Sequence, residues 1–159
     1  MAEKFSIDAF DLKILTLIQR DATLSLADIA ERVGLSSTPC WRRIQKLEQA
    51  GVIRRRVALL DPAALGLGLT AFVSIRTGQH DPAWLERFMH AAMALPEVVE
   101  INRLAGGWDY LLRVVVPDIA AYDAFYKRLI GIGGLSDVQS AFSMEQIKYT
   151  TELPLDAPA

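Results

Sequence analysis

The N-terminal third of the chain carries apolar side chains at the three- and four-residue spacing of amphipathic helices. The first such stretch runs from about Asp8, a candidate N-cap, to Arg20, with Asp11 placed to complement the helix dipole. Ser25 can cap a second, shorter stretch and Gly34 can end it, because glycine adopts a left-handed backbone without steric cost. The apolar positions of these two predicted helices are Phe10, Ile14, Leu17 and Ile18, then Leu26, Ile29, Ala30 and Val33.

The following residues predict a third helix. Ser36 can cap it, and Pro39 is tolerated in its first turn because the N–H groups there have no intrahelical partner. Its inward-facing positions are Cys40, Ile44 and Leu47. A short strand is expected over Val52–Leu60. Three helices and one strand predict a winged-helix-like module whose second and third helices form a helix-turn-helix.

After residue 68 the hydrophobic period changes, and strands alternate with helices. The expected elements are strand Thr70–Thr77, helix Asp81–Leu95, strands Val98–Leu104 and Asp109–Val116, helix Asp118–Ile130, and a last strand from about Val138 to Lys148. The order βαββαβ predicts a ferredoxin-like fold, so the chain as a whole is α+β. Two helices leave one sheet face uncovered, and a second copy of the chain is the simplest cover for it.

These patterns divide the chain into four parts. A helix-turn-helix domain is expected over residues 1–60, a linker over 61–68, a second domain over 69–152 and a flexible tail over 153–159. The linker sequence DPAALGLG holds a proline and two glycines, which interrupt regular structure.

Composition and charge narrow the class of protein. A hydrophobic fraction of 52% excludes wholesale disorder, and no apolar run is long enough to span a membrane. The N-terminal residues MAEKFSIDAF do not have the pattern of a secretory signal, and the single cysteine excludes an internal disulfide, so a cytoplasmic location is expected. Residues 1–60 have a net charge of +3 and residues 61–159 one of −5, which indicates that only the first part contacts nucleic acid.

The outward face of the third helix has the chemistry of a DNA reader. Arginine can donate two hydrogen bonds to guanine, glutamine can pair with adenine, and threonine offers a hydroxyl and a methyl group. Six basic residues and one acid, Glu48, lie between Arg42 and Arg56, which suits phosphate contacts. The alternative is a three-helix domain with an ordinary solvated basic face. The DNA-binding candidates are Thr38, Trp41, Arg42 and Gln45 on bases, Arg43, Lys46, Arg54, Arg55 and Arg56 on phosphates, and Ser37 without a stated role.

Several strings of residues, together with the order of the two domains, resemble the Lrp/AsnC (leucine-responsive/asparagine-responsive) transcription regulators. The strings are Leu35–Cys40 (LSSTPC), Arg43–Ile44, Leu47–Glu48, Gly51–Ile53 (GVI) and Gly106–Tyr110 (GGWDY), and the resemblance covers about Ser6 to Thr151. Two more strings, Gly66–Val73 and Met144–Thr151, resemble the subgroup that senses cysteine and controls its detoxification.

The resemblance implies a regulator that binds double-stranded DNA, dimerises, assembles further into tetramers or octamers, and binds one small amino acid between subunits, with no other cofactor. The second domain is then the amino-acid-sensing and oligomerisation domain. The implied effector-binding residues are Arg103, Gly106, Gly107, Trp108, Asp109, Phe142, Ser143 and Met144.

The residues of this implied site have plausible roles. Two glycines let the backbone approach a ligand and present N–H groups to a carboxylate, while Asp109 could hold an ammonium group. Arg103 could clamp a carboxylate or be a surface residue. The alternative is a hairpin turn in which glycine supplies the backbone angle and Asp109 caps the turn.

Other chemistry has little support in the sequence. His80 and His90 are the only histidines and have no acid–cysteine cluster at metal spacing, so neither a metal site nor an enzyme is expected. Two other functions stay open. The chain could be an architectural DNA-packing protein with little sequence preference, or an amino-acid sensor that acts through protein contact.

Overall fold

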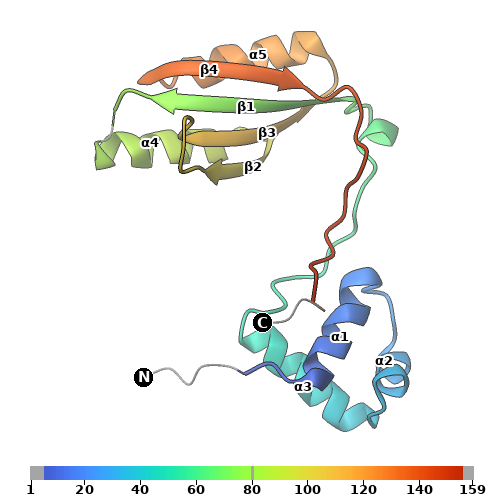
Figure 1. Cartoon of the computed structure of the whole chain (residues 1–159). Coiled ribbons are helices and arrows are strands. Elements are labelled where there is room, and N and C mark those ends of the chain that lie inside the picture. Colours follow the sequence, from blue (N-terminus) through green and yellow to red (C-terminus); the bar gives the residue numbers. More distant parts are fainter. Residues whose placement is uncertain (1–5, 80, 156–159) are drawn as a thin grey trace. The chain divides into compact units, whose positions relative to one another are not determined.

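The computed structural model describes residues 6–79 and 81–155, which form two compact units (Figure 1). The first unit holds the residues up to Leu59 together with those from Lys148 onward, and the second holds Leu60–Ile147. The first unit contains helices α1 (Ala9–Arg20), α2 (Leu26–Val33) and α3 (Ser37–Gln49). The predicted three-helix module is confirmed.

The helix ends of the first unit follow local chemistry. The Asp8 carboxylate accepts hydrogen bonds from the N–H groups of Phe10 and Asp11, and Ser25 and Asp28 cap α2 reciprocally. Gly34 ends α2 with φ of 75°, in the left-handed region as predicted. Ser36 precedes α3 with an extended backbone, but its side chain makes no capping hydrogen bond, so that expectation is wrong.

The three helices enclose one apolar core. Its buried members are the predicted inward positions Ile14, Ile18, Ile29, Ala30, Val33, Cys40, Ile44 and Leu47. Burial raises the pKa of the Cys40 thiol, so this side chain is a packed apolar group. Phe10, expected in the stripe of α1, is instead partly exposed beside Arg43.

No strand forms over Val52–Leu60, and the sequence-based expectation of a wing strand there is wrong. After a turn at Gly51 these residues are described as irregular backbone with exposed Val57, Leu59 and Leu60. A strand is stable only when its N–H and C=O groups pair with a neighbour, and no strand lies beside this segment among the described residues.

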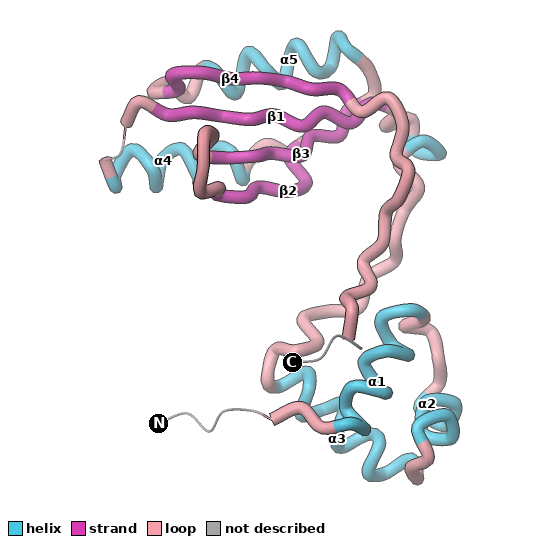
Figure 2. The backbone as a smooth tube through the Cα atoms, in the orientation of Figure 1, coloured by secondary structure: helices cyan, strands magenta, loops and turns pink. Residues whose placement is uncertain are grey.

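The second unit is an antiparallel sheet with two α-helices. Figure 2 shows its strands in magenta and its helices in cyan. Its elements are β1 (Leu69–Thr77), α4 (Pro82–Met93), β2 (Val98–Arg103), β3 (Tyr110–Val116), α5 (Ile119–Ile130) and β4 (Leu135–Phe142), preceded by the short 3₁₀ helix η1 (Ala63–Leu65). The strand order β2-β3-β1-β4 and the βαββαβ sequence confirm the ferredoxin-like prediction. The last strand begins and ends earlier than expected, at Leu135 and Phe142.

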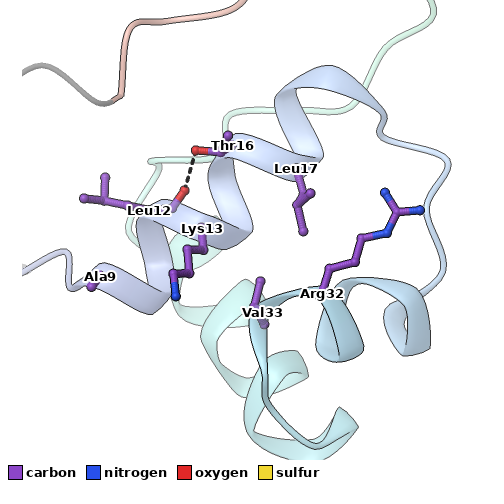
Figure 3. Close-up of a pocket in the computed structure, with 7 residues that line it drawn as sticks. All are labelled: Ala9, Leu12, Lys13, Thr16, Leu17, Arg32 and Val33. Atoms are coloured by element: carbon purple, nitrogen blue, oxygen red, sulfur yellow. Dashed lines mark hydrogen bonds between the residues drawn. The ribbon is translucent and has the colours of Figure 1, made fainter.

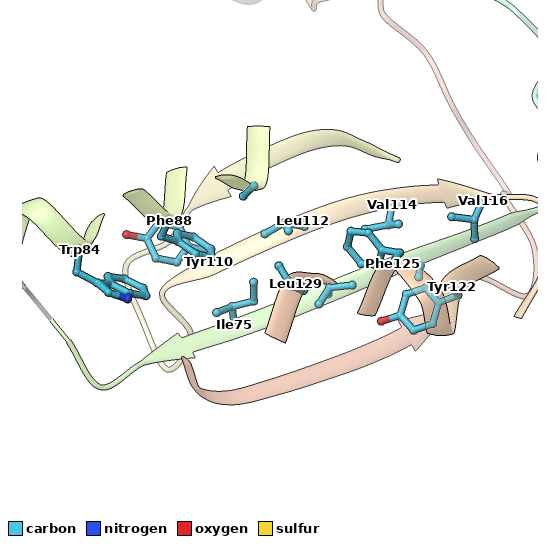
Figure 4. Packing of buried hydrophobic residues seen from close by; sticks show 13 residues of the cluster. Ile75, Trp84, Phe88, Tyr110, Leu112, Val114, Val116, Tyr122, Phe125 and Leu129 are labelled. Carbon is cyan, nitrogen blue, oxygen red and sulfur yellow. The ribbon is translucent and has the colours of Figure 1, made fainter. Parts of the chain in front are cut away.

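Both helices pack on one face of this sheet (Figure 4). Alternate residues of β1 are buried there, namely Ala71, Val73 and Ile75, while Phe72 and Arg76 point to the other face and are exposed. The Trp84 ring stacks on Phe88 with centroids 5.2 Å apart. The other buried helix residues are Ala92, Tyr122, Phe125 and Leu129.

The residues from Lys148 onward belong to the helical unit, which the sequence pattern did not indicate. The Gln19 side chain donates to the Leu153 carbonyl over 3.1 Å and accepts from the Leu153 N–H over 2.9 Å. Arg20 pairs with Glu152 at 3.0 Å. The expected domain of 69–152 therefore contributes its end to the first unit, and Leu153, expected in a flexible tail, is hydrogen-bonded; residues 156–159 lie outside the described part.

Candidate DNA-binding helix and effector loop

Helix α3 separates a buried face from an exposed one. Cys40, Ile44 and Leu47 are buried against α1 and α2, which fixes the direction of the remaining side chains. The outward set is exposed and contains Ser37, Thr38, Trp41, Arg42 and Lys46. Half of the Trp41 surface, 51%, is accessible, which is unusual for so large an apolar ring.

Arg43 has a different environment from the rest of the basic set. Its Nη1 pairs with Asp8 at 2.6 Å and Asp11 at 2.8 Å, and its guanidinium lies 5.3 Å from the centre of the Phe10 ring. The hydrogen bonds that the Arg43 guanidinium donates to the Asp11 and Asp8 carboxylates raise its pKa. The side chain thus joins α3 to the start of α1, and its geometry suits helix packing better than the expected phosphate contact.

Two further polar candidates are linked through one acid. The Gln45 amide donates to Glu48 over 3.0 Å, and Arg56 pairs with the same carboxylate at 3.1 Å. Four other cationic DNA-binding candidates make no hydrogen bond or ion pair with the described residues. They are Arg42, Lys46, Arg54 and Arg55. These four would not have to break a hydrogen bond or ion pair in order to contact another molecule.

The loop expected to hold the effector connects β2 to β3. It is closed by the Leu104 N–H, which donates to the Asp109 carbonyl over 2.8 Å. The Asp109 carboxylate accepts from the Thr77 N–H over 2.8 Å, and the Asp109 N–H donates to the Ile75 carbonyl. Asp109 therefore ties the loop to the end of β1, which matches the turn-capping alternative and leaves its second carboxylate oxygen for a ligand.

Three consecutive N–H groups of this loop are unused. Gly106 has φ of 157°, and the N–H groups of Gly106, Gly107 and Trp108 donate to no acceptor among the described residues. Gly106 and Gly107 are exposed and Trp108 is half-buried. Successive free backbone N–H groups are donors suited to an anion such as a carboxylate.

Arg76 is the residue of this site that sequence reasoning missed. Its Nε and Nη2 both donate to the Gly107 carbonyl, over 2.9 and 2.6 Å, and its guanidinium lies 4.9 Å from the centre of the Trp108 ring. Strand alternation places Arg76 on the exposed face of β1, but nothing in the sequence shows that this face meets a loop 31 residues later.

The structure does not bring the two parts of the expected effector site together within one chain. Phe142 pairs with Ala71 in the sheet, whereas the loop adjoins Ile75, four residues further along β1 and roughly 13 Å away at the rise of a strand. Phe142 also contacts the Tyr122 ring on the helix-covered face, and Met144 is fully exposed. A single ligand would reach the loop and Phe142–Met144 only if two copies of the chain contributed.

Arg103 ends β2 opposite Tyr110 and is exposed. Its side chain makes no hydrogen bond or ion pair with any described residue. It therefore remains compatible with either role considered for it, a carboxylate clamp or a surface cation.

A hollow of about 480 Å³ lies elsewhere, on α1 and α2 of the helical unit (Figure 3). Its lining is Ala9, Leu12, Lys13, Thr16, Leu17, Arg32 and Val33, none of them a candidate for DNA or effector.

In residues 6–79 and 81–155, no group of three or more His, Cys, Asp or Glu side chains is arranged to bind a metal ion, and His80 lies outside these residues. None of the helices in the same residues is long and apolar enough to cross a bilayer.

Comparison with known proteins accounts for the presence of both the exposed face of α3 and the loop between β2 and β3. Residues 70–153 match the Lrp/AsnC ligand binding domain, and residues 7–54 match a winged helix-turn-helix DNA-binding model. The chain belongs to the Lrp/AsnC family. It is therefore a transcription regulator with a DNA-binding unit and an amino-acid-binding unit, and not an enzyme.

Relatives cover almost the whole chain. The Escherichia coli DNA-binding transcriptional activator DecR is 53% identical over 151 residues, which are 94% of this chain and 99% of DecR. An AsnC family regulator from Agrobacterium tumefaciens, known from a crystal structure, is 64% identical, with a TM-score of 0.90 over 94% of this chain and 97% of its own.

A transcriptional regulator from Neisseria meningitidis, crystallised as a complex with L-methionine, is also similar. It is 38% identical, with a TM-score of 0.90 over 95% of this chain and 98% of its own. The fold described here is therefore one in which a relative has been seen with an amino acid.

Proposed function

We propose that this regulator recognises a specific DNA sequence through α3 and changes its DNA binding when a small amino acid, with cysteine as the first candidate, occupies the loop between β2 and β3. The observation that supports this proposal is the exposed face of α3. Thr38, Trp41 and Arg42 lie on this face, opposite the buried apolar face of the same helix. A helix held this way can enter the major groove with its N-terminal residues on base edges.

Each candidate has a role in this proposal. Thr38, Trp41, Arg42 and Gln45 contact bases, and Ser37 lies at the start of the same helix. Lys46, Arg54 and Arg55 contact phosphates because no internal partner engages them, and Arg56 joins them by leaving Glu48. Arg43 acts indirectly, since its pairing with Asp8 and Asp11 holds α3 at a fixed angle to α1.

The effector binds at the loop, with its carboxylate on the free N–H groups of Gly106, Gly107 and Trp108. The second oxygen of Asp109 accepts from its ammonium group. Phe142, Ser143 and Met144 complete the site from another copy of the chain, because the sheet places Phe142 opposite Ala71 and away from the loop at Ile75. Arg103, which ends β2 beside the loop, clamps the effector carboxylate within the same copy. This arrangement needs a homodimer, which would assemble further into a tetramer or octamer.

The uncovered sheet face supports that assembly. Phe72 is 40% exposed there, and both helices lie on the opposite face. A dimer presents two reader helices about one DNA turn apart and favours a near-palindromic operator. Amino-acid binding shifts this geometry only if one state binds the amino acid more tightly.

Replacing Arg42 with alanine tests base reading. A duplex is first selected from a random library with the wild-type protein, and affinity is then measured for it and for single-base variants. We expect Arg42→Ala to lose discrimination at one base pair by about 1–3 kcal/mol, or roughly fivefold to 150-fold, because its bidentate contact is lost. Unchanged discrimination by Arg42→Ala would remove it from the reader set.

Arg55→Ala is the matched control, since it also removes one free cation. It should weaken binding to all duplexes alike and lower the salt dependence by about one phosphate contact. A wild-type protein that selects no sequence would instead favour architectural packing, and one with no DNA affinity at low salt would favour a sensor that acts through protein contact.

A thermal-shift screen of the twenty amino acids identifies the effector, because a ligand of the native state raises the melting temperature.

A further inference from the structure

Arg76 makes a specific contact with the effector loop. The side chain comes from β1, and both Nε and Nη2 donate to the Gly107 carbonyl while the guanidinium stacks over Trp108. A guanidinium within about 6 Å of an aromatic ring centre is attracted by the ring. Two donors on one oxygen and a ring beneath them fix the direction of that carbonyl.

The direction of the Gly107 carbonyl determines the direction of the Trp108 N–H. The peptide unit between Gly107 and Trp108 is planar and trans, so its N–H points away from its C=O. An Arg76 side chain that holds the Gly107 carbonyl therefore also holds the Trp108 N–H on the opposite side. That N–H is one of the three loop donors without an internal acceptor.

The loop needs such a restraint. Glycine at positions 106 and 107 gives the backbone many accessible conformations, and ordering a flexible segment on binding costs conformational entropy. Asp109 restrains only the far end of the loop, through the Thr77 N–H. Arg76 restrains the middle.

We infer that Arg76 is a positioning residue for the amino-acid effector. It orders the Gly107–Trp108 peptide before binding. The N–H groups of the loop can then bind the effector carboxylate without a further loss of conformational entropy in the loop. The inference rests on the proposed function, because it assigns a role within the same site.

The test compares Arg76→Ala and Arg76→Lys with the wild-type full-length protein. Lysine keeps the charge but lacks the planar two-donor group. Affinity is measured calorimetrically for the amino acid that gives the largest shift in the thermal screen, and for its amide, which has no carboxylate. Arg87→Ala serves as a control, because Arg87 is an exposed arginine of the same unit that contacts none of these residues.

We expect Arg76→Ala to bind the amino acid about tenfold to a hundredfold more weakly, the range for a lost charge-assisted hydrogen bond. Its preference for the amino acid over the amide should fall, and Arg76→Lys should remain several-fold weaker than wild type. In ¹⁵N spectra without ligand, the amide signals of Gly107 and Trp108 should move in Arg76→Ala and stay in place in Arg87→Ala. DNA affinity without amino acid should not change.

Two results overturn the inference and leave the proposed function intact. One is a wild-type affinity in Arg76→Ala or Arg76→Lys. The other is weaker binding by Arg76→Ala with unmoved Gly107 and Trp108 signals, which would mean that the charge acts from a distance. If the wild-type protein binds none of the twenty amino acids, the effector proposal fails first and the inference with it.

Discussion

At the scale of single residues, the least expected feature is the Asp8–Asp11–Arg43 cluster. Asp11 keeps only 9% of its side chain exposed and Arg43 30%, so the pair is partly shielded from water. A half-buried charge is tolerable when each group meets an opposite charge and hydrogen bonds, as here. Asp11 was expected only to favour the helix dipole, but it also links α1 to α3 through Arg43.

The cluster predicts an acid-sensitive helical unit. Hydrogen bonds from the Asp11 N–H and from Arg43 hold the pKa of Asp8 below its ordinary value of 3.8. A lowered pKa in the folded state stabilises the protein above pH 3.8 and loses that effect as the pH falls through the folded pKa. Asp8→Asn keeps a good cap but removes this titration.

We therefore expect the free energy of unfolding to fall less steeply between pH 5 and pH 2 in Asp8→Asn than in wild type, as measured by urea denaturation at several pH values. Glu31→Gln, at an exposed position of α2 in the same unit, is the control and should follow the wild type. Parallel curves for wild type and Asp8→Asn would contradict the assigned role.

At the scale of elements, Gly133 and Gly134 form a packed turn between α5 and β4. Both have φ of 76°, and the Trp84 indole N–H donates to the Gly133 carbonyl over 3.2 Å. A Cβ on Gly134 would lie 2.2 Å from Trp84 Nε1, whereas one on Gly133 would meet nothing within 4 Å. The Trp84 ring cannot yield freely because it is stacked on Phe88.

This difference gives a matched pair of variants. Gly134→Ala should destabilise the second unit by about 2–4 kcal/mol, since backbone strain adds to overpacking of a buried ring. Gly133→Ala carries the strain alone and should cost about 1 kcal/mol. The measurement is the free energy of unfolding, followed by the near-UV signal of the tryptophans, and equal losses in both variants would show that the clash with Trp84 is relieved.

At the scale of the whole molecule, the helical unit is built from both ends of the chain. The chain crosses between the two units near Leu59 and again near Ile147. The Gln19 amide forms a closed pair of hydrogen bonds with the Leu153 backbone, across 134 residues of sequence. The strand β4 of the sensing unit is thus joined covalently to a segment that is itself fixed on α1.

Removal of this pair should loosen the C-terminal segment. We expect Gln19→Ala to speed amide hydrogen exchange at Leu153 about fivefold, since an exposed pair of hydrogen bonds is worth about 1 kcal/mol. Gln19→Glu retains the acceptor for the Leu153 N–H and should give a smaller effect. Exchange at Leu153 as slow in Gln19→Ala as in wild type would mean that other contacts hold the segment.

The sequence alone determined the features that depend on neighbouring residues. Apolar spacing located three helices, Gly34 located the turn of the helix-turn-helix, and strict alternation located β1 with Ala71, Val73 and Ile75 inward. The sequence-based prediction of buried residues was wrong where apolar residues lie on more than one face of a helix. Along α5 the helical spacing of Ile119, Tyr122, Tyr126 and Leu129 predicts one buried stripe, but Phe125 is fully buried and Ile119 is exposed.

Tertiary structure alone decided which distant residues meet. Arg76 reaches Gly107, Asp109 reaches Thr77, and Arg43 reaches Asp8 and Asp11, because antiparallel register and helix packing bring them together. The same register separates Phe142 from the loop. Periodicity shows which way a side chain points, but only the pairing of strands and helices shows what it points at, because that pairing is the sum of many weak contacts over the whole core.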